Sequence, residues 1–118
     1  MNLTSFARPV LLRRAKKIDR YFTHAEEIQR AVLARLIKNA AKTEWGQKYG
    51  YADLKDYEAF AAAVPLNAYE TLKEPIDRMR HGEKDVLCKG KVKWYAKSSG
   101  TTNDKSKFIP VSKAYLKD

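Results

Sequence analysis

Apolar side chains recur every three or four positions through the first forty residues, which is the period of a helix with one apolar face. A first helix is expected over residues 11–22, with Pro9 in its first turn or just before it. Thr23 and Glu26 have the spacing of a capping box and predict a second helix that runs to about Ala41. The two helices are expected to pack on each other or on a larger body.

Shorter segments with polar caps follow up to residue 84. Residues 43–50 predict a turn or a single helical turn, with Trp45 and Tyr49 as core anchors. Two further helices are bounded by residues with distinct backbone preferences. The first is capped by Asp53 or Asp56 and ends at Pro65. The second is capped by Asn67, is kinked or restarted at Pro75, and ends at Gly82.

From Asp85 onward the apolar period changes to two, which is typical of a strand. Val92 and Trp94 fall on one side, and Trp94 is expected to be buried; Tyr95 lies with lysines on the other side, which is expected to face solvent. Residues 107–111 predict an antiparallel partner strand, and Ser112 can cap a final helix. The sequence therefore predicts an α+β fold, with four or five helices in residues 1–84 and a β-hairpin in residues 85–118.

The loop of this hairpin carries the most specific chemistry in the chain. Gly100 allows a positive φ, and successive backbone N–H groups in such a turn form a concavity that binds anions. Hydroxyls on both sides of Gly100 can donate to phosphate oxygens or lie near Mg²⁺, and lysine ammonium groups can neutralise phosphates. The candidate phosphate-binding residues are Ser98, Ser99, Gly100, Thr101, Thr102 and Lys107. A hairpin turn rich in Ser and Thr, without a ligand, is the alternative interpretation.

The order of motifs around this loop favours the phosphate interpretation. A strand leads into the loop core of residues 98–102, and Lys107 and an apolar pair ending at Pro110 follow. This arrangement resembles the auxin-responsive, Gretchen Hagen type acyl-acid amido synthetases of the acyl-adenylate-forming superfamily. The upstream motifs of that family also occur in order, as Val64-Pro65, Tyr69-Glu70, Pro75-Ile76-Asp77-Arg78 and Gly82-Glu83.

The resemblance implies an ATP-dependent ligase with ATP and Mg²⁺ as cofactors. A small carboxylic acid would attack the α-phosphate of ATP, and an amine would then attack the acyl carbon of the adenylate. The chain would be the N-terminal part of such an enzyme and inactive by itself. The six loop residues would act as the phosphate clamp, and no catalytic residue is assigned. Asp104 and Ser106 stand where the family has Gly and Pro, which changes the turn and places a carboxylate near the phosphates.

Composition adds a second hypothesis. The net charge is +10, and the first fifty residues hold 11 of the 24 Lys and Arg but 4 of the 14 acidic residues. The cluster around Arg13 to Arg20 could meet nucleic acid, an anionic surface or a partner protein, or could be a solvated helix face. Because no nucleic-acid motif accompanies the charge, no nucleic acid is expected as a partner.

The remaining features exclude several classes of site. Cys88 is the single cysteine, so an intrachain disulfide is impossible, and a buried thiol in a strand is expected. His24 and His81 lack metal-ligand spacing with Cys88, so no metal site is assigned to the protein itself. No apolar run approaches the ~20 residues of a membrane span, and a cytoplasmic location is expected. Surface that belongs against the rest of an enzyme would favour self-association.

Overall fold

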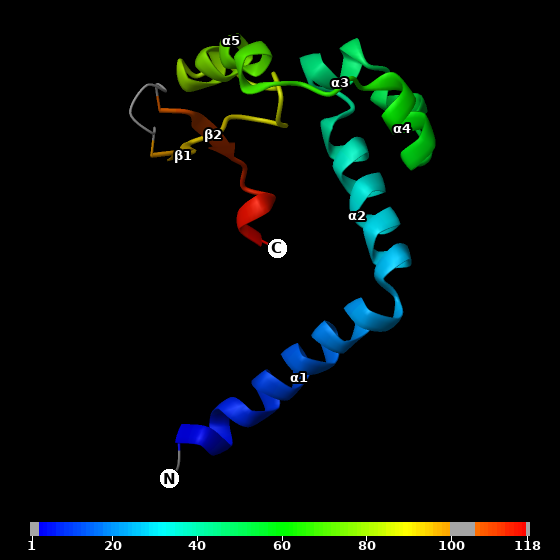
Figure 1. Ribbon diagram of the computed structural model, residues 1–118. Helices are drawn as coiled ribbons and strands as arrows, with labels where there is room; N and C mark the ends of the chain where they lie inside the picture. Colours follow the sequence, from blue (N-terminus) through cyan, green and yellow to red (C-terminus); the bar gives the residue numbers. More distant parts are fainter. Residues whose placement is uncertain (1–2, 100–105, 118) are drawn as a thin grey trace. The chain divides into compact units, whose positions relative to one another are not determined.

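The computed structural model describes residues 3–99 and 106–117, with side chains from residue 7 to residue 116 of these ranges. The chain divides into two units, residues 1–33 and 34–118. Five α-helices, two 3-10 helices (η) and a two-stranded antiparallel sheet follow within the described residues (Figure 1). They are α1 (Leu3–Thr23), α2 (Ala25–Ala40), α3 (Glu44–Lys48), η1 (Tyr51–Asp53), α4 (Tyr57–Ala63), α5 (Tyr69–Arg80), β1 (Trp94–Lys97), β2 (Phe108–Val111) and η2 (Tyr115–Lys117).

This architecture confirms the predicted α+β class, with helices first and a β-hairpin after them. The domain boundary expected between residues 84 and 85 stays a prediction. Among the described residues, no helix combines the length and the apolar character that crossing a bilayer requires.

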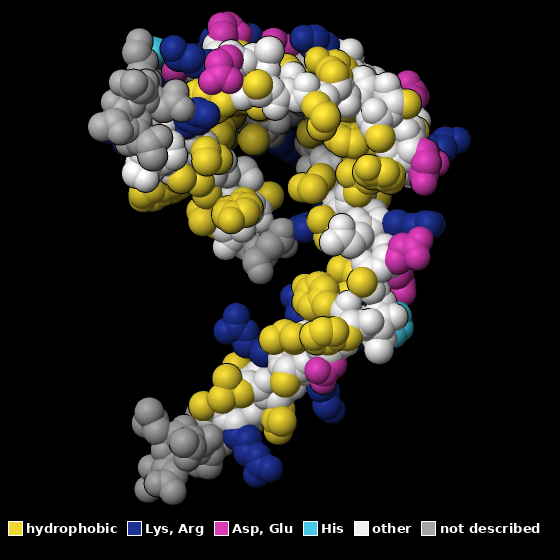
Figure 2. All heavy atoms as spheres, viewed as in Figure 1, with side chains coloured by type: hydrophobic (Ala, Val, Ile, Leu, Met, Phe, Trp, Pro, Cys, Tyr) yellow, Lys and Arg dark blue, Asp and Glu magenta, His cyan; other side chains and the backbone are white. Residues whose placement is uncertain are grey.

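The first helix is longer than its sequence pattern predicted, and it passes through Pro9. Thr23 is its last residue rather than the cap of the next helix, and the Thr23 hydroxyl pairs with Nδ1 of His24 at 2.7 Å. α2 therefore begins at Ala25, two residues after the predicted cap. The described side chains of α1 are all exposed, so α1 buries no face against α2 within the described residues, and the alternative, packing on a larger body, stays a prediction. Figure 2 shows hydrophobic side chains along α1, interspersed with Lys and Arg.

The predicted cap at Asp56 is confirmed, and Thr43, which was not predicted as a cap, also begins a helix. The Thr43 hydroxyl accepts a hydrogen bond from the Gly46 N–H at 3.0 Å and begins α3, and the Asp56 carboxylate accepts one from Ala59 at 2.8 Å and begins α4. The predicted cap at Asn67 is wrong, because its side-chain amide donates to the Pro65 carbonyl instead. Side-chain bonds to the nearby backbone compete with capping in this way.

α5 begins at Tyr69 without a side-chain cap and continues through Pro75, which is buried inside it. The helix ends at Arg80, and Gly82 adopts a φ of 99°, as its predicted role as the C-terminal stop requires.

The most deeply buried cluster is formed by the C-terminal half of α5 and the segment that follows it. Met79, Val86 and Val92 are almost fully buried, and Leu87, Cys88 and Tyr95 pack against them. Trp94 is 66% exposed, so the prediction that it is buried is wrong. Tyr95, on the side that was expected to face solvent, is half-buried. The strand begins at Trp94, and Val92 lies before it. The alternation of a strand therefore does not place Val92 and Trp94 on the same face. Cys88 lies in an irregular segment rather than a strand, and burial raises the pKa of its thiol.

The hairpin has the predicted antiparallel register, with Trp94 opposite Val111 and Lys97 opposite Phe108. Figure 1 shows α5 alongside this hairpin. The segment before β1 is tied to α3 by two backbone bonds, from the Glu44 N–H to the Asp85 carbonyl at 2.8 Å and from the Trp45 N–H to the Val86 carbonyl at 3.1 Å. These contacts place the hairpin, α3 and α5 in one unit.

Candidate functional site

The loop between β1 and β2 is closed at its base by a pair of hydrogen bonds. The Ser98 N–H donates to the Lys107 carbonyl at 2.9 Å, and the Lys107 N–H donates to Oγ of Ser98 at 3.1 Å. Both side chains are half-buried. We call these bonded residues, Ser98 and Lys107, the loop neck. The predicted site residues Gly100, Thr101 and Thr102 lie outside the described residues, as does Asp104.

The side chain of Tyr69, at the start of α5, meets the neck from the other side. Its hydroxyl oxygen accepts a hydrogen bond from the Phe108 N–H at 2.9 Å. Its ring lies 5.5 Å from the Lys107 ammonium, within the range of a cation–π contact. At the opposite end of α5, the Arg80 guanidinium stacks 3.8 Å from the centre of the Phe108 ring. Both ends of α5 therefore contact the residues that leave the loop.

Three predicted or neighbouring polar groups remain available around this neck. Ser99 is exposed, and Ser106 is half-buried. The Ser98 oxygen is occupied by the Lys107 N–H, but a hydroxyl has one hydrogen of its own that can still be donated. The neck thus presents hydroxyl donors next to a lysine ammonium, which is chemistry suited to a phosphate.

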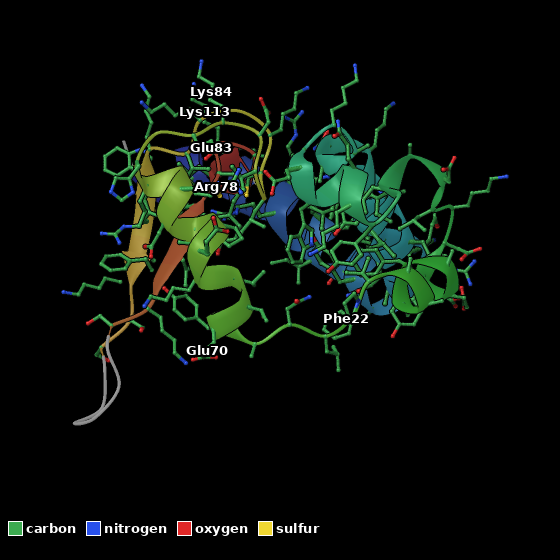
Figure 3. The ribbon with its side chains drawn as sticks, turned by 90° about the horizontal axis from the view of Figure 1, so that it is seen from above. Phe22, Glu70, Arg78, Glu83, Lys84 and Lys113 are labelled. Carbon is green, nitrogen blue, oxygen red and sulfur yellow. The ribbon has the colours of Figure 1, made fainter. Side chains whose placement is uncertain are left out.

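A second polar cluster on α5 is centred on Arg78. Its guanidinium donates to both carboxylate oxygens of Glu44, at 3.0 and 2.6 Å, and to both of Glu83, at 2.7 Å for one of them. Figure 3 shows Arg78 and Glu83 together, with Glu70 towards the other end of α5. The side-chain hydrogen bonds from Arg78 hold the pKa of both Glu44 and Glu83 below the usual range. Glu83 and then Glu44 raise the pKa of Arg78.

Sequence reasoning missed this cluster. Arg78 and Glu83 were both members of recognised motifs, and their closeness in the sequence could have suggested a pair. Glu44 lies 34 residues before Arg78, and no local pattern connects the two.

An open hollow of about 600 Å³ runs along the same surface of α5. Four of its lining side chains are carboxylates, and the Arg78 guanidinium is already bonded to Glu44 and Glu83. The hollow is therefore a poor site for a phosphate, which the excess of carboxylates would repel. Its lining residues are Glu70, Lys73, Glu74, Asp77, Arg78, His81 and Glu83. Within the described ranges, no group of three or more His, Cys, Asp or Glu residues could hold a metal ion.

Comparison with known proteins identifies the relatives of this chain. The model of the GH3 family N-terminal domain matches residues 14–118. The chain is 31% identical over 94 residues to the indole-3-acetic acid-amido synthetase GH3.6 of Arabidopsis thaliana, a match that covers 79% of this chain and 15% of the relative. It is also 31% identical over 102 residues to the 4-substituted benzoates-glutamate ligase GH3.12 of the same plant, covering 86% of this chain and 18% of the relative.

The fold has a counterpart among solved structures. The structure of the GH3.15 acyl acid amido synthetase matches with a TM-score of 0.76 at 28% sequence identity, and the match covers 86% of this chain and 18% of that one. The chain therefore spans less than a fifth of the length of these relatives.

Proposed function

The chain belongs to the GH3 family, and we propose that it supplies the phosphate-binding loop of an ATP-dependent acyl acid amido synthetase. Its curated relatives carry names of amido synthetases and of a glutamate ligase. The observation that carries the proposal is the loop neck, where Ser98 and Lys107 are bonded to each other at the base of a loop rich in hydroxyls.

The proposed reaction has two steps that both proceed by substitution. A carboxylate oxygen of a small acid attacks the α-phosphorus of ATP, and pyrophosphate leaves. The nitrogen of an amine then attacks the acyl carbon, AMP leaves, and the nitrogen gives up a proton. Such steps depend on positioning and on neutralising charge more than on covalent help from the protein.

Ser98, Ser99, Gly100, Thr101, Thr102 and Lys107 are proposed to contact the phosphates. The described members fit this role, because Ser99 is exposed, Ser98 has a hydrogen to donate, and the Lys107 ammonium lies against the Tyr69 ring. Mg²⁺ bound with ATP would neutralise phosphate charge. The carboxylate of Asp104 is proposed to face solvent or this ion, since it would otherwise repel the phosphates.

We also propose that the 118 residues alone do not catalyse ligation. They span 15–18% of the relatives, so the remaining length of such an enzyme is available for the acid and amine sites. Nucleic acid is not among the proposed partners, and a cytoplasmic location is proposed because ATP is abundant there.

Titration of the ¹⁵N-labelled chain with MgATP tests the phosphate loop. The amide signals of residues 98–107 are expected to shift with a dissociation constant near 1 mM, which corresponds to about −4 kcal/mol. Ser99→Ala and Lys107→Ala should each weaken binding several-fold, whereas Lys38→Ala, an exposed lysine on α2, should not. Loop signals that ignore MgATP, or that respond equally in all variants, would contradict the proposed phosphate clamp.

A chimera tests the ligase activity. Residues 14–118 would replace the matching segment of the Arabidopsis 4-substituted benzoates-glutamate ligase, whose name supplies the acid and the amine to be used. A folded chimera is expected to release pyrophosphate when given ATP, a 4-substituted benzoate and glutamate, and Ser99→Ala in the chimera should slow release at least tenfold. Release that is unchanged by Ser99→Ala would contradict the assignment of this residue.

A further inference from the structure

We propose that Tyr69 is a positioning residue for phosphate binding, because its side chain fixes both the backbone after Lys107 and the Lys107 ammonium. The proposal deepens the proposed function and rests on it. The first observation is the 2.9 Å hydrogen bond from the Phe108 N–H to the Tyr69 hydroxyl oxygen. Phe108 is the first residue of β2, at the point where the loop returns to the sheet.

The direction of the backbone groups explains why this bond needs a side chain. Successive N–H groups along a strand point to opposite edges. The Lys107 N–H faces Ser98 and donates to its Oγ, so the Phe108 N–H faces away from β1. Within the described sheet β2 pairs with β1 alone, and the Tyr69 hydroxyl receives the N–H that the sheet does not use. Lys107 is therefore held from both sides, by Ser98 and by Tyr69.

The ring of Tyr69 acts on the same residue in a second way. The Lys107 ammonium lies 5.5 Å from the ring centre, so a cation–π contact holds the long side chain over α5. A lysine that is already restrained loses less conformational freedom when it binds a phosphate. The hydroxyl and the ring together thus prepare one cation and one end of the loop for an anion.

The hydroxyl has no comparable role in the core. Tyr69 is half-buried and lies at the first turn of α5, while the buried cluster is formed by Met79, Val86 and Val92. Phenylalanine would keep the ring and its contact with Lys107, and would remove only the acceptor for Phe108. The variant Tyr69→Phe therefore isolates the hydroxyl, and Tyr69→Leu removes the ring as well.

The experiment measures the affinity of the 118-residue chain for MgATP, with magnesium pyrophosphate as a second probe. Tyr69→Phe is expected to weaken both about fivefold, which is the fold-change given by the loss of one hydrogen bond. Tyr69→Leu should weaken them further. Tyr57→Phe is the matched control, because Tyr57 is 65% exposed on α4 and its variant should bind as the parent does. Amide hydrogen exchange at Phe108 should also be faster in Tyr69→Phe, while that of α5 stays unchanged.

Measuring the dissociation constants under conditions where every variant is fully folded separates a merely structural role of Tyr69 from a positioning role. Where each variant is fully folded, a loss of global stability leaves the dissociation constant unaltered, so only a change in the loop itself weakens binding. Binding by the parent together with equal affinity of Tyr69→Phe would overturn the positioning role and leave the proposed function in place. No binding of either probe by the parent chain would overturn the phosphate loop, and the positioning role with it.

Discussion

The hydroxyl of Thr43 offers the sharpest test of what stabilises the unit of residues 34–118. Thr43 is 1% exposed, and its Oγ donates to the Ala40 carbonyl at 2.7 Å and accepts from the buried Gly46 N–H at 3.0 Å. Valine has the same shape, so Thr43→Val keeps the packing and removes both bonds. The Ala40 carbonyl retains the Thr43 N–H at 2.9 Å as a donor, so the orphaned group is the Gly46 N–H.

The magnitude follows from that single orphaned donor and the lost cap. Leaving a buried N–H unsatisfied costs about 1–3 kcal/mol, and loss of a threonine N-cap typically costs about 1 kcal/mol. The two costs overlap, because the cap is the bond that satisfies the Gly46 N–H, so they are not added. We therefore expect Thr43→Val to lower the free energy of unfolding by about 2 kcal/mol. With a urea m-value of about 1.5 kcal/mol/M, the midpoint should fall by about 1.3 M.

Urea unfolding followed by circular dichroism at 222 nm measures this loss. Thr43→Ser keeps the hydroxyl and should recover most of the stability. Thr71→Val is the matched control, since Thr71 is exposed and water can replace its 2.6 Å bond to the Ala68 carbonyl, so a loss below about 0.5 kcal/mol is expected. A loss in Thr43→Val that is no larger than in Thr71→Val would refute the reasoning.

Two further predictions concern charge and the exposed face of α1. Because Arg78 lowers the folded-state pKa of Glu44 and Glu83, its pairs stabilise the fold above an unperturbed glutamate pKa of about 4.3 and lose this effect as the pH falls through the lowered values. Arg78→Gln should thus shift the urea midpoint more at pH 6 than at pH 3, and equal shifts would contradict this. The apolar surface of α1 should make the chain self-associate in light scattering, whereas Leu11→Ser with Phe22→Ser should be monomeric; a monomeric parent at 50 µM would refute it.

Local signals in the sequence were accurate where the interaction itself is local. Asp56 caps the helix that begins at the next residue, residues 43–50 contain the short helix that was expected as a single turn, and Gly82 follows the end of α5 with a positive φ. The antiparallel pairing around the loop also followed from the alternation and the turn residues. Each of these features depends on groups within about four residues of one another or on the two arms of one hairpin, so the chain's wider path does not affect them.

Local signals failed where another hydrogen bond of the same side chain competed with the expected one, or where tertiary packing decided burial. Thr23 pairs with the neighbouring His24 ring instead of capping α2, and Asn67 bonds to the Pro65 carbonyl. Trp94 is exposed although an apolar neighbour two positions earlier is buried, because burial depends on which surface lies opposite. A period of two identifies the faces of a strand but not which face is covered.

The α+β class, the order of helices and hairpin, and the family could all be predicted from the amino-acid sequence, because periodicity, caps and ordered motifs are local features of the chain. The tertiary structure alone placed Tyr69 against Phe108, 39 residues later, and Arg78 against Glu44, 34 residues earlier. Hydrogen bonds of this kind form between groups that the folded chain brings within about 3 Å, and no spacing in the sequence specifies that distance.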